Sequence, residues 1–267
     1  MIKSYKPIDE EEFKNHQIFL RLDEMIDFYK LLSFSIFGFV TLGTKAMSNI
    51  DSYLYSSVQG TLESMKIIVK NGRINDAYAL LRKYYDLSII NIYSNVYLSK
   101  YFNSENFIVE KINNWIEGKE QLPEYRVMSE YIKKSKELEK INEVLHKDDR
   151  YKKIRDRCND HTHYNCYKNV LFNDNEIYLK DRVKALGIFL HDLEQIFILH
   201  LSCVFYLNGH YMASSDYMDN IEMGMTPEEG SQYHVAPFVQ KAFNNFIKNK
   251  RLDLADRIKS NTVMRLE

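Results

Sequence analysis

Glycine, proline and cysteine are all scarce in this chain. Among its 267 residues are only 9 Gly, 4 Pro and 3 Cys. The apolar residues, in turn, recur mostly at a spacing of three and four positions rather than two, which is the period of a helix and not of a strand. The sequence therefore predicts an all-α fold.

The few cysteines do not suggest a disulfide framework or a metal motif. Cys158, Cys166 and Cys203 cannot all pair with one another, and none has the CxxC spacing. This pattern fits a reducing compartment. The first residues are also too acidic and polar for a signal peptide. We expect a cytoplasmic protein.

The chain also lacks an excess of charge of either sign. Lys and Arg number 36 and Asp and Glu 37, so no overall positive field attracts nucleic acid or acidic membranes, and any anion site must be local. No Gly-rich phosphate loop, GxSxG elbow, HExxH motif or paired-carboxylate pattern occurs. These absences argue against kinase, hydrolase and Rossmann functions, and no cofactor is expected.

Two apolar stretches, residues 31–47 and 186–207, are the only ones that suggest a membrane span. The first has about 13 residues before Lys45, fewer than the ~20 that a span needs. The second contains His191, Asp192, Glu194 and His200. Both are better explained as buried helices of a bundle, and no membrane partner is expected.

Helical periodicity predicts an up-and-down bundle of four to five long helices in residues 1–210. We expect helices at about 13–47, with a break near Gly38 or Gly43, and at 50–70, 76–100, 128–157 and 181–208. A short helix should surround Trp115. Tyrosines at helical spacing in the third helix are expected in the core: Tyr84, Tyr85, Tyr93 and Tyr97.

Residues 211–267 are expected to form a separate extension of loop and short helices. The sequence is polar and Met-rich to about residue 233 and then resumes helical spacing, with a break near Asn249. Val239, Phe243 and Phe246 form one apolar stripe. The extension should therefore pack through this stripe on the bundle or on a partner.

Basic, amide and imidazole groups crowd together in the segment Arg155–Asn165. If this segment is helical, Arg155, Asn159 and His163 recur every four residues and line one stripe, and Arg157 and His161 form a second pair. An arginine that holds a phosphate beside a histidine that titrates near neutrality can support RNA cleavage without a metal. The alternative is a solvated helix with two incidental histidines.

Each residue of this cluster has an expected role. His163 is the base or acid, Arg155 or Arg157 grips the phosphate, and Asn159 orients the reacting groups. On a helix, Arg157 and His163 point about 120° apart, so a complete site could combine two copies across a twofold axis. We therefore expect a homodimer. His161 lies near the apolar face of the helix and is the more structural of the two histidines.

The surroundings of the cluster are basic. From Lys133 to Arg157 there are ten Lys and Arg against six Asp and Glu, a surplus that leads into the cluster and would suit an approaching RNA, although mixed charge runs usually form a solvated helical face. Arg82 and Asp86, one turn apart, predict an ion pair. This pair is either an ordinary structural one or a clamp that orients a residue of the cluster.

Zinc is the competing explanation for the same segment, because Cys158, His161, His163 and Cys166 place four good ligands within nine residues. On one helix these side chains fan over about 200°, too wide for one tetrahedral ion. The two cysteines are then expected to be small core residues, and no metal is expected.

The cluster resembles the HEPN superfamily, whose helical domains carry an arginine followed by a histidine four to six residues on. Two overlapping matches occur. Arg155 with His161 has the family's polar residue, Asp156, directly after the arginine, whereas Arg157 with His163 has Cys158 there. The register is therefore open. The segment 72–82 also looks like a loop and helix start of such proteins, and the similarity covers about residues 50–208.

The resemblance implies a bundle of four or five helices and a homodimer with the motif at its interface. It also implies metal-independent RNA cleavage in a toxin, phage-defence or stress role, with RNA and an antitoxin or other protein as partners. The alternative is a non-catalytic helical dimer, a scaffold or partner-binding module in which Arg82, Asp86, Arg155 and His163 form a structural network.

Overall fold

The computed structural model describes residues 6–36, 43–44, 50–176 and 182–267. Within these ranges the chain forms helices and isolated bridge pairs but no β-strand, which confirms the all-α prediction. The α-helices are α1 (Glu11–Lys14), α2 (Gln17–Ser35), α4 (Ile50–Lys70), α5 (Ile74–Tyr101), α6 (Glu110–Ile116), α7 (Tyr125–Lys133), α8 (Glu139–Leu145), α9 (Arg150–Thr162), α10 (Tyr167–Leu171), α11 (Arg182–Leu207), α12 (Asp216–Glu222), α13 (Pro237–Ala242) and α14 (Leu252–Asn261). Short 3-10 turns lie at Pro7–Asp9, Gly209–Met212 and Ser231–Tyr233, and a π-helical segment, Phe243–Lys248, continues α13.

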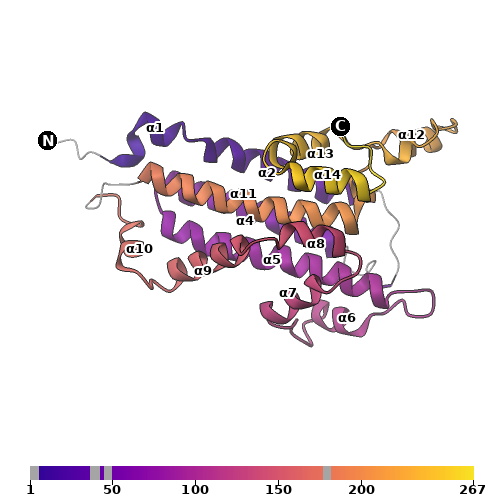
Figure 1. Ribbon diagram of the computed structural model, residues 1–267, viewed down its shortest axis with the longest axis horizontal. Helices are drawn as coiled ribbons and strands as arrows, with labels where there is room; N and C mark the ends of the chain where they lie inside the picture. The colour runs from indigo at the N-terminus through magenta and orange to yellow at the C-terminus, as the bar shows by residue number, and fades with distance from the viewer. Residues whose placement is uncertain (1–5, 37–42, 45–49, 177–181) are drawn as a thin grey trace.

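Four long helices form the body of the molecule (Figure 1). α2 packs on α4, α4 on α5, α5 on α11, and α11 on α2. α7 and α9 pack on α5, and the C-terminal helices pack on α2, α8 and α11. Their apolar stripe is almost fully buried, with Val239 and Phe243 at 0% and Phe246 at 1% exposure. The segment after residue 236 therefore shares one core with the long helices.

The turn between α4 and α5 depends on a glycine. Gly72 has a φ of 69°, in the left-handed region that favours glycine. A Cβ at this position would also collide with the side-chain oxygen of Asn175, whose amide nitrogen donates to the Asn71 carbonyl at 2.7 Å. The turn separates α4 from α5, and the bounds of both helices lie within two residues of the predicted ranges, 50–70 and 76–100.

The expected helix at 13–47 is wrong at its start, where it divides into α1 and α2. His16 precedes α2, and its ring nitrogen accepts the backbone N–H of Ile18 at 3.2 Å, which caps the new helix. α2 then ends at Ser35. Gly43 has a left-handed φ of 59°, and the expected break at Gly38 lies outside the described residues.

The single helix expected at 128–157 is also wrong, because the chain forms α7, α8 and α9 there instead. Polar side chains make the two turns without Gly or Pro. Asn142 donates to the Ile132 carbonyl at 2.9 Å, near the end of α7. Asp148 accepts the backbone N–H of Arg150 at 3.0 Å, at the start of α9. Side-chain hydrogen bonds of this kind replace the missing backbone partners at helix ends.

α11 is the one described helix long and apolar enough to cross a membrane, but 83% of its most apolar window is buried inside the protein. It carries buried polar groups, among them Asp192 and His200. These groups have partners on neighbouring helices, as a core helix requires.

A buried carboxylate joins α4, α5 and the turn after α11. Asp51 is 6% exposed. Its Oδ1 accepts from the amide nitrogens of Asn91 at 2.9 Å and Asn95 at 2.7 Å, and its Oδ2 accepts from the Tyr211 hydroxyl at 3.0 Å. Three neutral donors thus solvate this carboxylate in place of water.

The same network extends through a buried histidine on α11. Because Asn91 donates to Asp51 through its nitrogen, its oxygen accepts from His200 Nε2 at 2.9 Å. His200 Nδ1 then accepts from the Tyr29 hydroxyl at 2.7 Å, and the hydroxyl oxygens of Tyr29 and Tyr84 lie 2.8 Å apart. Burial lowers the pKa of His200 to about 3, so it is uncharged at neutral pH.

Candidate functional site

α9 lies against α5 and brings together four residues that the sequence singles out. The Asp86 carboxylate binds both Arg82, from Nε at 2.9 Å, and Arg155, from Nη1 at 2.6 Å. Arg82 Nη1 also donates to the side-chain oxygen of Asn159. The expected Arg82–Asp86 ion pair is confirmed. We call Arg82, Asp86, Arg155 and Asn159 the α5–α9 cluster.

An aromatic ring holds one arginine of this cluster in place. The guanidinium carbon of Arg155 lies 3.2 Å from the ring centroid of Tyr125 on α7. The Tyr125 hydroxyl in turn donates to the Tyr85 hydroxyl at 3.0 Å. A guanidinium over a tyrosine face gains from the ring quadrupole. Arg155 is therefore fixed by a carboxylate on one side and a ring on the other, with 16% of its side chain exposed.

Arg157 points to a different partner. Its Nε and Nη2 donate to the two oxygens of Asp192 on α11, at 2.6 and 3.2 Å. The Asp192 side chain is fully buried, whereas 39% of the Arg157 side chain is exposed. Burial raises the pKa of Asp192, and the bound guanidinium opposes that rise. Arg157 thus bridges the surface of α9 to a carboxylate in the core.

His161 is a core residue, as its place on the apolar side of the helix predicts. It is 7% exposed, its Nδ1 lies 2.8 Å from the side-chain oxygen of Asn75, and its ring stacks on Tyr78 with centroids 3.9 Å apart. Burial lowers its pKa to about 4, and nearby Arg157 acts in the same direction. An uncharged buried imidazole of this kind packs the α5–α9 contact and is badly placed to meet a large substrate.

His163 lies outside the helix that was expected to present it. α9 ends at Thr162, so His163 is its exposed C-cap. Tyr164 follows with a left-handed φ of 52°, and the backbone N–H of Asn165 returns to the Asp160 carbonyl at 3.0 Å. These bonds close a Schellman-type end. The expectation of a regular helix through Asn165 is therefore wrong.

The site residues predicted from the sequence thus lie in three separate places. Arg155 and Asn159 join the α5–α9 cluster, Arg157 and His161 face the core side of α9, and His163 stands at its exposed end. In the described part of the chain, no contact joins His163 to either arginine. Neither pair with the HEPN-type spacing, Arg155 with His161 or Arg157 with His163, is joined by a contact in the described residues, whereas Arg157 and His161 line one pocket.

The cysteines of the zinc pattern separate in the same way. Cys158 is fully buried, and burial raises the pKa of its thiol to about 12. Cys166 is exposed, so the expectation that it is a core residue is wrong. Across the described ranges, no group of three or more His, Cys, Asp or Glu side chains is arranged to hold a metal ion.

Three residues that shape this site escaped the sequence reasoning: Tyr125, Asn75 and Asp192. Asp192 interrupts an apolar run, and a charge within such a run signals a buried ionic partner. Asn75 is the second residue of α5, and its place in the sequence suggests a helix cap, but its side chain contacts His161. Tyr125 carries no signal, because its contact with Arg155 depends on the turn between α7 and α9.

The chain matches no protein-family model, no curated protein and no solved structure.

Proposed function

We propose that this protein is a HEPN-type homodimer that binds RNA and cleaves it without a metal, in the cytoplasm and in a toxin, phage-defence or stress role. In this proposal α2, α4, α5, α9 and α11 form the up-and-down bundle of long helices within residues 1–210, and residues 211–267 form an extension packed on it. The all-helical fold and the packing of α5 on α4, α9 and α11 support this assignment.

The observation that carries the proposal is the distribution of groups along α9. His163 is exposed at the helix end, and Asn159 and Arg155 lie one and two turns before it, each partly exposed. An imidazole open to solvent can reach a substrate. The Arg155 guanidinium, two turns or about 12 Å away along the helix axis, would bind a flanking phosphate of the same RNA strand.

Exposed apolar side chains beside His163 support the dimer. Tyr164, Tyr167 and Val170 are 49%, 78% and 45% exposed. Large apolar groups gathered at the surface are typical of interaction sites. A twofold contact through this segment would bring the end of α9 in one subunit close to α9 of the other, and could unite His163 with an arginine of the partner.

The chemistry then needs His163, the arginines of α9 and water. His163 takes the proton of the RNA 2′-hydroxyl, whose oxygen attacks phosphorus while the bond to the 5′-oxygen breaks, and a water molecule protonates that oxygen. Arginine N–H groups bind the non-bridging oxygens. Each arginine retains donors for this, because Arg155 contacts Asp86 through Nη1 and Arg157 contacts Asp192 through Nε and Nη2.

One observation favours the alternative, a non-catalytic scaffold or partner-binding dimer. Both arginines of the motif are already bound to carboxylates of their own chain, Arg155 to Asp86 and Arg157 to Asp192. In a structural network, the role of the two arginines is to form these ion pairs. In an enzyme they orient arginines that must also bind phosphate.

Cleavage of a single-stranded RNA by the purified protein separates the two functions. We expect His163→Ala to lower the cleavage rate by ~10²-fold or more, with EDTA without effect and products ending in 2′,3′-cyclic phosphate. His191→Ala, which removes an exposed histidine of α11, is the matched control and should cleave like wild type. Light scattering should give the mass of a dimer.

Equal cleavage by wild type and His163→Ala would contradict the catalytic proposal. A wild-type protein that neither binds nor cuts RNA over a range of salt concentrations would leave the scaffold function as the conclusion. A strict monomer would remove the composite site.

A further inference from the structure

A cavity of about 330 Å³ lies between α5, α7, α9 and α11, apart from His163 and the end of α9. This volume is at the lower end of the range for small-molecule sites. The loop between α8 and α9 and the side chains of α7 surround its opening. The cavity thus extends from the surface toward the centre of the molecule.

Most of the wall is apolar. α5 contributes Tyr85, Ile89 and Ile92, and α11 contributes Leu199 and Cys203, all of them buried. Leu145, Ile132 and Tyr151 complete the inner wall. Such a wall excludes a strongly hydrated ligand and favours a ring or another apolar group.

Polar side chains line the cavity as well, Asn142 and His146 among them. The side-chain oxygen of Asn142 is buried and, within the described ranges, has no hydrogen-bond partner, while its nitrogen donates to the Ile132 carbonyl. A ligand N–H would satisfy this oxygen. His146 also lines the cavity, and burial, helped by nearby Lys133, lowers its pKa to about 4. Its neutral ring suits an apolar ligand.

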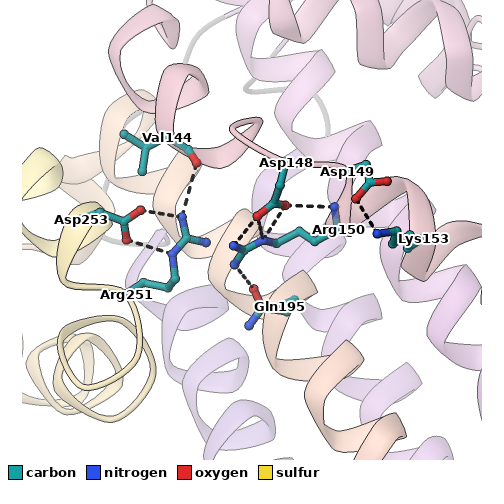
Figure 2. A network of polar contacts seen from close by, with 8 residues as sticks. All are labelled: Val144, Asp148, Asp149, Arg150, Lys153, Gln195, Arg251 and Asp253. Atoms are coloured by element: carbon teal, nitrogen blue, oxygen red, sulfur yellow. Dashed lines mark hydrogen bonds and ion pairs between the residues drawn. The ribbon is translucent and has the colours of Figure 1, made fainter.

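The opening carries positive charge that its carboxylates do not cancel. Asp148 binds Arg150 at 2.6 Å and Asp149 binds Lys153 at 2.9 Å, and Figure 2 shows both pairs, with Arg150 also donating to Gln195. These carboxylates are therefore occupied by cations that do not line the cavity.

The cations that do line the opening are less engaged. Glu130 pairs with Lys133 at 3.7 Å. Arg126 and Lys152, both exposed, line the cavity and form no ion pair with any described residue. A ligand anion at the opening would thus meet two available cations.

We propose that this cavity binds a small aromatic anion, with its ring among the α5 and α11 side chains, a ring N–H on Asn142 and its carboxylate at Arg126 and Lys152. Indole-3-carboxylate has these three features and serves as the probe. This proposal does not rest on the RNA function, but the two sites share Arg155. Tyr125 and Arg155 line the cavity, so a bound ligand would touch the ring that holds Arg155 in the α5–α9 cluster.

Titration calorimetry with indole-3-carboxylate and its neutral carboxamide tests each feature in the full-length protein. Wild type should bind the carboxylate about fivefold more tightly than the carboxamide. The double variant Arg126→Ala/Lys152→Ala should lose that preference and leave carboxamide binding unchanged. Lys140→Ala, which removes an exposed lysine of α8 that does not line the cavity and forms no ion pair with a described residue, is the matched control and should bind like wild type.

Ser129→Trp tests the cavity itself. Ser129 lines it from the partly exposed side of α7, so a tryptophan there can fill the space without replacing a core residue. This substitution should lower the binding affinity for both ligands by about tenfold or more. Circular dichroism should show both variants folded.

The proposal is overturned if wild type binds neither ligand at millimolar concentration. It is equally overturned if a folded Ser129→Trp protein binds both as wild type does. A loss of anion binding caused by Lys140→Ala as large as that of the double variant would reject the assigned anion position. The double variant replaces only exposed residues, so a failure of Ser129→Trp to fold leaves the anion test decisive.

Discussion

Asp51 and Asp86 each collect donors from two parts of the chain, but one does so in the core and the other at the surface. Asp51 is 6% exposed and accepts from three neutral groups. The Asp86 side chain is 37% exposed and binds two guanidinium groups. Among the described residues no cation forms an ion pair with the core carboxylate, whereas the surface carboxylate pairs with two.

This difference separates groups that hold the fold from groups that can be used. Loss of Asp51 removes three buried hydrogen bonds, and water cannot easily replace the carboxylate. Around Asp86, water and ions reach the arginines, so a phosphate can join or replace the carboxylate at low cost. The core network is therefore expected to control stability, and the α5–α9 cluster to control ligand binding.

The largest expected effect comes from removing the two carboxylates, one at a time. Asp51→Ala should lower the free energy of unfolding by about 3 kcal/mol, roughly 1 kcal/mol for each of the three hydrogen bonds lost. Asp86→Ala should cost about 1 kcal/mol or less, because its ion pairs are partly solvated. Urea denaturation measures both. Equal losses for the two variants would show that the surface cluster is as structural as the core.

A smaller effect concerns the pH dependence of the core network. Burial lowers the pKa of His200 to about 3, so the unfolded chain binds a proton that the folded chain excludes. The contribution of His200 to the free energy of unfolding is therefore fully present above the ordinary histidine pKa of about 6.5, and it is lost as the pH falls toward 3. Between pH 7 and 5 the loss should be about 2 kcal/mol from this group.

Urea denaturation of His200→Gln at the two pH values isolates that contribution. The variant should lose about 2 kcal/mol less than wild type between pH 7 and 5. His191→Gln, an exposed histidine on the same helix, should keep the wild-type dependence. A pH dependence unchanged in His200→Gln would mean that His200 is protonated in the folded protein.

Local spacing accounts for the parts of the fold that the sequence predicts well. α4 and α5 follow from helical periodicity and the Asn71–Gly72 stop, and the Arg82–Asp86 pair from its spacing. The breaks between α7, α8 and α9 were missed because side chains of Asn142 and Asp148, rather than Gly or Pro, make the turns. An Asp-Asp pair before Arg150 is helix-start chemistry that the long charged run obscured.

Only part of the candidate site can be predicted from the sequence, and the reason is different. The spacing of Arg155 and Asn159 on one stripe holds, since both contact α5. The stripe fails at His163, because the helix ends at Thr162 and Tyr164, just after His163, has a left-handed conformation. The partners Asp192 and Tyr125 are 35 and 30 residues away from the arginines they meet, and no local rule relates them.

The most direct test of the division between core and surface is the RNA affinity of Arg155→Ala set beside its stability. Fluorescence anisotropy with a labelled single-stranded RNA should show affinity reduced by about tenfold and a salt slope reduced by about one, while stability falls by about 1 kcal/mol or less. His200→Gln should do the reverse, with lower stability and wild-type affinity. If Arg155→Ala binds RNA like wild type and is destabilised as much as His200→Gln, the α5–α9 cluster is part of the scaffold and the account is contradicted.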